Sequence, residues 1–218
     1  MRMIQSCEIR WFLASAPEAV LIWFERRGQH FSKEEQAGRC DFYLVSEAVR
    51  NDLGIKLREG NLEIKERTTE FGAHTFSASA EGRVEAWRKW SFKLAHTREG
   101  GTDEVLHITR QDVQNSAWVP VGKDRLQVIL EMAEESRVLL SGAPAFSLDE
   151  GCGVELTKIR LPDRVCYSFA LEAFSRTGHE YQNLKRAVDT MTAEIPGLEL
   201  SLTESMGYPE FLNNIAKP

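Results

Sequence analysis

The clearest chemical signal in the sequence is a stretch of alternating charged and apolar residues, LGIKLREGNLEIKER, at positions 53–67. Its charged positions on alternate residues are Lys56, Arg58, Glu63, Lys65 and Arg67. Side chains two residues apart share one face of a strand, so two such runs around EGN predict a β-hairpin with a charged face. Four cations gathered on two strands with one carboxylate would repel each other. We therefore expect this face to bind an anion.

A second interpretation of the hairpin is that its charged face meets water, which is common for one side of an antiparallel sheet. The hairpin alone does not decide between the two. The same alternation of cations with apolar residues recurs in distant segments of the chain, however, at Lys89, Lys93, Lys158 and Arg160. This recurrence favours a shared anion site, to which these four cations are added on alternation alone.

Composition limits the classes of partner. The chain has 218 residues, 42% of them hydrophobic and 28% charged, which is ordinary for a globular protein. A net charge of −6 argues against a general binder of extended nucleic acid or of an acidic membrane, because such proteins need a basic surface. A local cationic cavity for an anionic, phosphate-containing small molecule is compatible with it. The oligomeric state is left open.

The N-terminal segment MRMIQSCEIRWFL resembles no signal peptide, and no apolar run is long enough to span a bilayer. We therefore expect a cytoplasmic protein. The four cysteines are scattered singly, without the spacing of a zinc site or a disulfide framework, and are expected to be buried thiols.

Several further segments have the patterns of regular structure, and together they indicate many antiparallel strands with a few helices in one domain. In the segment 6–12, Cys7, Ile9 and Trp11 alternate with Ser6, Glu8, Arg10 and Phe12. Strands are expected at 6–12, 39–45, 76–80, 82–94, 105–110, 154–161, 165–175 and 199–202. Helices are expected after capping boxes at Ser15–Glu18 and Thr177–Glu180, and at 209–215. The segment 124–140 fits either type, and we favour a helix there.

The order of these motifs resembles the CYTH, or triphosphate tunnel metalloenzyme, superfamily. That family opens with a strand Glu-x-Glu-x-Lys, followed by a helix, a strand pair of roughly Leu-Arg-x-Arg and Leu-Thr-x-Lys, and a later strand that bears glutamate. The corresponding segments here are SCEIR at 6–10, IKLR at 55–58, LEIK at 62–65 and FALE at 169–172. Two positions depart from the family pattern, since Ser6 replaces the first glutamate and Arg10 replaces the lysine.

The resemblance implies an α+β fold in which residues 1–218 form a single domain, an eight-stranded antiparallel β-barrel open at both ends with flanking helices. It implies phosphate contacts at Arg10, Lys56, Arg58 and Lys65. It also implies Mg²⁺ or Mn²⁺ held by Glu8 and Glu172. Because Ser6 replaces one expected ligand, Glu63 and Glu155 are candidates for a further carboxylate, and no motif selects between them. We therefore expect the protein to bind a polyphosphate or a triphosphate-containing small molecule in a cationic tunnel, with metal-dependent, triphosphatase-like hydrolysis as a further activity. Two alternatives stay open, which are an anion-binding module without a metal site and a sheet scaffold for a protein partner.

Overall fold

The alternating patterns of the sequence fold into nine strands and three α-helices in the part of the chain that the structure describes. The computed structural model describes residues 2–32, 34, 38–45, 50–94, 118–132, 138–141 and 147–216. The elements are β1 (Arg2–Leu13), α1 (Glu18–Glu25), β2 (Arg39–Leu44), β3 (Leu53–Arg58), β4 (Asn61–Ser77), β5 (Ala80–Lys93), β6 (Trp118–Met132), β7 (Val138–Ser141), β8 (Glu150–Arg160), β9 (Val165–Ser175), α3 (Glu180–Glu194), the 3₁₀ turn η2 (Leu202–Glu204) and α4 (Tyr208–Ala216).

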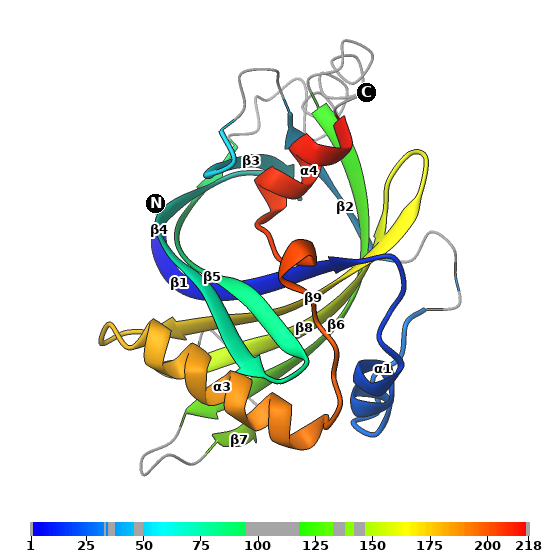
Figure 1. Ribbon diagram of the computed structural model, residues 1–218. Coiled ribbons are helices and arrows are strands. Elements are labelled where there is room, and N and C mark those ends of the chain that lie inside the picture. The colour runs from blue at the N-terminus through cyan, green and yellow to red at the C-terminus, as the bar shows by residue number, and fades with distance from the viewer. Residues whose placement is uncertain are drawn as a thin grey trace.

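The strands form one antiparallel sheet that closes on itself (Figure 1). Its order is β2-β3-β4-β5-β1-β9-β8-β6-β7, and β2 pairs in addition with β6. This extra pairing joins the first strand of the order to the eighth and closes an eight-stranded barrel, while β7 extends the edge of β6. The predicted α+β, single-domain barrel with flanking helices is confirmed. None of the described helices is both long and apolar enough to cross a bilayer.

The predicted charged hairpin is formed by β3 and β4. Its two-residue turn places Glu59 at φ 48° and Gly60 at φ 74°, the conformation that matches the twist of a tight hairpin. The register sets Lys56 directly opposite Glu63. The carboxylate therefore lies between the cations, and the expected repulsion between facing like charges is relieved inside the hairpin itself.

The main hydrophobic core lies on the outer side of the barrel wall. Cys7, Ile9 and Trp11 of β1 point outward, as predicted, and are nearly fully buried. They belong to the same cluster as Leu184 and Val188 of α3, which lies across the outside of the barrel (Figure 1). Because neighbouring residues of a strand point to opposite faces, this packing turns the polar positions of the same strands into the barrel interior.

The prediction of a helix at 124–140 was wrong, because the described residues of this segment, 124–132 and 138–140, belong to β6 and β7. Leu126 and Leu130 are buried in the outer core and Val128 between them packs against it, so outward-facing residues recur every two positions, while Lys123 and Arg125 line the cavity. That period of two is the strand pattern. The pairing of β6 with both β8 and β2 outweighs the local helical spacing of Leu126 and Ile129.

Other boundaries also differ from the expectations. Residues 76–80 are the end of β4 and the turn to β5, not a separate strand, and 199–202 contributes only a single bridge of Leu200 to Ala80 before η2. Neither expected capping box forms, since the residues at the N-caps are Pro17 and His179, without a side-chain cap. Cys40 is exposed, unlike the other three cysteines. The strand expected at 105–110 lies outside the described residues.

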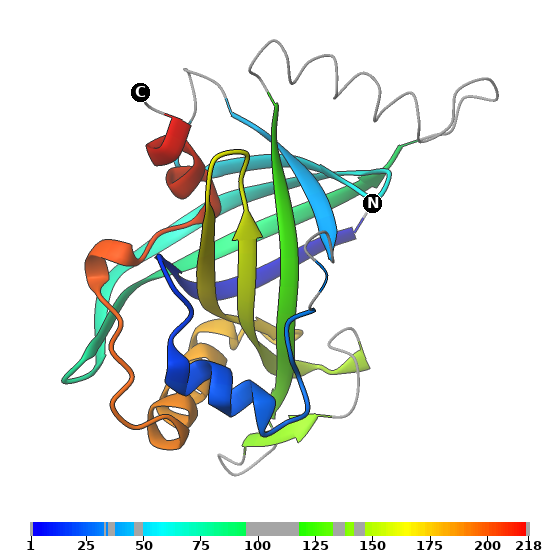
Figure 2. The ribbon, with the colours of Figure 1, turned by 90° about the vertical axis from the view of Figure 1, so that its right-hand side faces the viewer.

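One end of the barrel is filled by the C-terminal helix. Phe211 and Leu212 of α4 pack with interior side chains of three strands, Phe12, Val121 and Ile159, in a second apolar cluster. The ring of Phe211 stacks on that of Phe12 at 3.8 Å between centroids. Figure 2 shows α4 against the end of the barrel wall. The resemblance implies a barrel open at both ends, but in the described structure α4 closes one of them.

Candidate functional site

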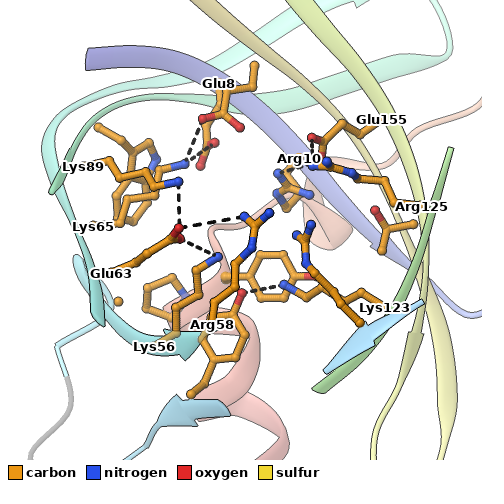
Figure 3. Close-up of a pocket in the computed structure, with 18 residues that line it drawn as sticks. Glu8, Arg10, Lys56, Arg58, Glu63, Lys65, Lys89, Lys123, Arg125 and Glu155 are labelled. Carbon is orange, nitrogen blue, oxygen red and sulfur yellow. Dashed lines mark hydrogen bonds and ion pairs between the residues drawn. The ribbon is translucent and has the colours of Figure 1, made fainter. Parts of the chain in front are cut away.

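The barrel interior contains a cavity in which charged side chains converge from eight strands (Figure 3). It offers about 140 Å³ to the centres of water molecules, roughly ten times what one water needs. Among the described residues, its charged lining consists of eight cations and four carboxylates, namely Arg10, Arg39, Lys56, Arg58, Lys65, Lys89, Lys123, Arg125, Glu8, Glu63, Glu155 and Glu172.

The cavity has a wet mouth and a dry floor. Side chains such as those of Lys89, Arg125 and Glu172 keep 30%, 31% and 34% of their surface exposed. Those of Lys123 and Arg10 keep only 6% and 8%. The two buried cations lie beside Tyr208 of α4, at the end that the helix closes. An anion must therefore enter from the opposite side.

Near the mouth, Lys65 joins two glutamates from neighbouring strands. Glu8 of β1 and Glu172 of β9 are directly paired in register, and the Lys65 Nζ lies 2.6 Å from Glu8 Oε2 and 3.4 Å from Glu172 Oε1. The Lys65 ammonium lowers the pKa of Glu172 to about 2, against the effect of burial. Burial opposes the charge of Lys65, but Glu172 and Glu8 outweigh it and raise its pKa. Lys65 and Glu172 are therefore both charged at neutral pH.

A second cluster surrounds Glu63 of β4. Lys56 and Lys89 place their Nζ atoms 3.0 Å and 3.3 Å from Glu63 Oε2, and Arg58 Nη1 lies 3.8 Å from Oε1. Burial raises the pKa of Glu63, but the surrounding cations outweigh it, led by Lys56, so its pKa is lowered. Burial lowers the pKa of Lys89, and Glu63 only partly offsets this. One carboxylate thus holds three cations in place.

At the floor, three cations surround the fully buried Asp41 of β2. Lys123 Nζ lies 3.1 Å and Lys56 Nζ 3.6 Å from Asp41 Oδ2, and Arg39 Nε lies 3.3 Å from Oδ1. Lys123 also donates a hydrogen bond to the hydroxyl of Tyr43. Burial and the neighbouring Lys56 hold the pKa of Lys123 well below its ordinary value, although Asp41 opposes them. Positive charge exceeds negative charge at the floor.

The remaining wall of the cavity is built around Glu155 of β8. Arg125 Nη1 lies 2.8 Å from Glu155 Oε1, and Arg10 Nη2 lies 3.9 Å from Oε2. Arg10 also donates to the hydroxyl of Ser168 at 3.3 Å. Burial opposes the charge of Arg10, but Glu8 and Glu155 outweigh it and raise its pKa. Both guanidiniums are thereby held toward the cavity.

The structure brings together nine of the residues that the sequence singled out, and it places four elsewhere. Within the cavity are Arg10, Lys56, Arg58, Lys65, Lys89, Glu8, Glu63, Glu155 and Glu172. Arg67 pairs instead with Glu85 and Glu70, and Lys93 is exposed at the end of β5. Glu155 and Thr157 line the cavity, so Lys158 and Arg160, at the alternate positions, lie on the outer face of β8.

Sequence reasoning missed Arg39, Lys123 and Arg125 as lining residues. Lys123 and Arg125 lie two residues apart, like the cations of the hairpin, but they alternate with Gly122 and Asp124 instead of apolar residues, and the segment 124–140 was expected to be a helix. Arg39 begins a predicted strand and is followed by Asp41 at the alternate position, a pair that no motif distinguished. Tyr43 and Tyr208 were missed as lining residues as well, because the two rings stack on each other only when α4 packs into the end of the barrel.

The metal that the resemblance implies can be tested against the side chains present. Glu8 and Glu172 offer hard oxygen donors in register, and Mg²⁺ is commonly held by one or two carboxylates together with substrate phosphates. The Lys65 ammonium lies between them, where a cation is favoured. This pair therefore fits Mg²⁺ or Mn²⁺. Glu63 does not, since it lies in its own cluster of three cations, and the described residues contain no group of three metal-ligating side chains.

Comparisons with known proteins find no related sequence and a distant likeness among solved structures. No family model matches the sequence, and no curated protein does. Among solved structures, the chain is similar to the S. pombe Pct1 RNA triphosphatase, with 9% sequence identity and a TM-score of 0.38. The similarity covers 90% of this chain and 86% of that chain. A likeness this distant carries no argument about function, which has to be made from the cavity itself.

Proposed function

We propose that this protein binds a polyphosphate or a triphosphate-containing small molecule in the barrel interior. The observation that carries the proposal is the charge of the cavity, where eight cations of the described lining face four carboxylates. When the buried Asp41 beneath the floor is included, the positive charges of the cavity still exceed the negative charges by three. Buried charge without compensation is costly. An anion with several negative charges supplies that compensation.

The carboxylates of the cavity hold its cations ready for the ligand. Each of Glu63, Glu155 and Asp41 gathers two or three cations, so these side chains are ordered before the ligand arrives. A phosphate chain then meets donors that already point inward, such as Lys56 and Arg58 (Figure 3). Arginine and lysine bind phosphate oxygens with charge-assisted hydrogen bonds. Preorganisation of this kind lowers the entropic cost of binding.

A second candidate function is hydrolysis of the bound chain, favoured by the pairing of Glu8 with Glu172. These two carboxylates would hold Mg²⁺ or Mn²⁺, which polarises a phosphoryl group and can supply an activated water. The chain's own contribution is to orient the phosphates with Lys56 and Arg58 and to neutralise charge that develops on them. Since Lys65 already neutralises the two glutamates, binding is proposed as the primary function and slow hydrolysis as the secondary one.

The test is calorimetric titration of the protein with tripolyphosphate, with inorganic sulfate as a control anion. We expect one ligand per chain and an affinity that falls as salt is raised, because several ion pairs are formed. Arg58→Met should weaken binding about 10- to 100-fold through loss of a charge-assisted contact. Lys158→Met, which removes a cation of the outer face, is the matched control. Absence of binding, or equal losses in both variants, would overturn the proposal.

A further inference from the structure

The closed end of the cavity combines a tyrosine side chain with two buried cations. Tyr208, the first residue of α4, contributes its ring to the cavity lining. Its ring lies 4.0 Å from the Lys123 Nζ and 5.2 Å from the Arg10 Cζ, measured to the ring centroid. One aromatic side chain thus brings the two most buried cations of the cavity together at the floor.

The hydroxyl of Tyr208 has no hydrogen-bond partner among the described residues, although it is buried. A buried hydroxyl that donates to nothing is unfavourable by about the value of a lost hydrogen bond. Its ring is fixed by stacking on Tyr43, 5.4 Å between centroids, and by an edge contact with Phe12. The donor is therefore rigidly placed at the floor, and a ligand oxygen at that end would satisfy it.

The cations at the floor of the cavity also outnumber the carboxylates that neutralise them. Asp41 is the carboxylate nearest to Lys123, and it is shared with Lys56 and Arg39. Behind Tyr208, Phe211 and Leu212 fill the barrel with apolar side chains. A phosphate chain that reaches the floor cannot pass through, so the group that arrives there has to be the end of the chain.

We propose that Lys123, Arg10 and Tyr208 form a subsite for a free terminal phosphoryl group, so that the protein selects chains with at least one uncapped end. The inference rests on the proposed function and deepens it, since it names the ligand class by its end group. A terminal phosphoryl group has one more ionisable oxygen than an internal one, which suits a subsite of two buried cations and an unused hydroxyl donor.

The experiment compares, by calorimetry, tripolyphosphate and ATP, which have free ends, with diadenosine tetraphosphate, whose phosphate chain is capped at both ends. The wild type should bind the first two at least tenfold more tightly than the third. Tyr208→Phe removes only the hydroxyl and keeps the stacked ring, so the free protein should not be destabilised, and its melting temperature should rise by about 2–4 °C for each kcal/mol that the unpartnered hydroxyl costs. Its affinity for tripolyphosphate should fall about 10- to 100-fold, as for loss of a hydrogen bond to a charged group. Tyr181→Phe on α3 is the matched control.

A second variant, Lys123→Met, should abolish the preference for uncapped chains while tripolyphosphate still binds through the cations near the mouth. Equal affinity of the wild type for capped and uncapped chains, or an unchanged affinity in Tyr208→Phe, would overturn the terminal subsite and leave the proposed function intact. If no phosphate ligand binds the wild type at all, the proposed function fails and the inference fails with it. Should Lys123→Met not fold, Tyr208→Phe alone still decides.

Discussion

Replacing Lys65 with methionine should destabilise the protein by about 3 kcal/mol at neutral pH. The Glu8 side chain is only 4% exposed, and Lys65 Nζ lies 2.6 Å from its carboxylate. Removing one member of a buried ion pair costs about 3–5 kcal/mol, because the remaining charge is uncompensated. We expect the lower end, since Lys65 and Glu172 keep 27% and 34% of their side chains exposed and water screens part of the effect. For a chain of this size the melting temperature falls by about 6–12 °C.

The pH dependence of this loss gives a second readout. The pKa of Glu172 is lowered from 4.5 to about 2 chiefly by Lys65, so its contribution to stability is present above pH 4.5 and is lost as the pH falls toward 2. The difference in the free energy of unfolding between wild type and Lys65→Met should therefore be largest at pH 7 and become smaller below pH 4.5. Differential scanning calorimetry at several pH values measures it. Lys93→Met, at an exposed lysine of β5, is the control and should change stability by less than about 0.5 kcal/mol. Equal stability of the two variants would refute the reasoning.

Three further predictions concern binding and metal. Because burial holds the pKa of Lys123 well below the ordinary 10.5, affinity for tripolyphosphate should fall as the pH rises through a range below that of an ordinary lysine, and a calorimetric pH series in which wild type and Lys123→Met lose affinity alike would show that Lys123 does not contact the ligand. Ser6→Glu puts a second carboxylate on the face of Glu8, so Mg²⁺ should raise the melting temperature of this variant more than that of wild type, and Glu8→Gln should remove the response. Wild type should release phosphate from tripolyphosphate slowly or not at all with either metal, and brisk release would contradict the role assigned to Lys65.

The parts of the fold that could be predicted are those whose sequence pattern is local. The β3–β4 hairpin has its turn and the charged positions of both strands within fifteen residues. In β1, strict alternation separates the residues of its two faces. Segments 39–45, 82–94 and 165–175 were recognised as strands for the same reason. One face of each of these strands packs in the outer core, and the cations on the opposite face therefore line the cavity.

The remaining parts depend on contacts between distant segments. Apolar residues in 124–140 fit two periods, and only the pairing of β6 with β8 and β2 decides for a strand. That error also hid Arg125, which lies inside the segment. Alternation could place Lys158 and Arg160 on one face but not say which face of β8 points inward. The closure of the barrel by α4, and with it the role of Tyr208, follows from tertiary packing that no local motif announces.

The most direct test of the cationic cavity is a crystal structure of the protein with tripolyphosphate. We predict one phosphate chain inside the barrel, with its oxygens in hydrogen-bonding contact with Lys56 and Arg58 and one end at Lys123 and Tyr208. Phosphate bound only to cations of the outer surface, such as Lys158, with an empty barrel interior at a saturating ligand concentration, would contradict the account.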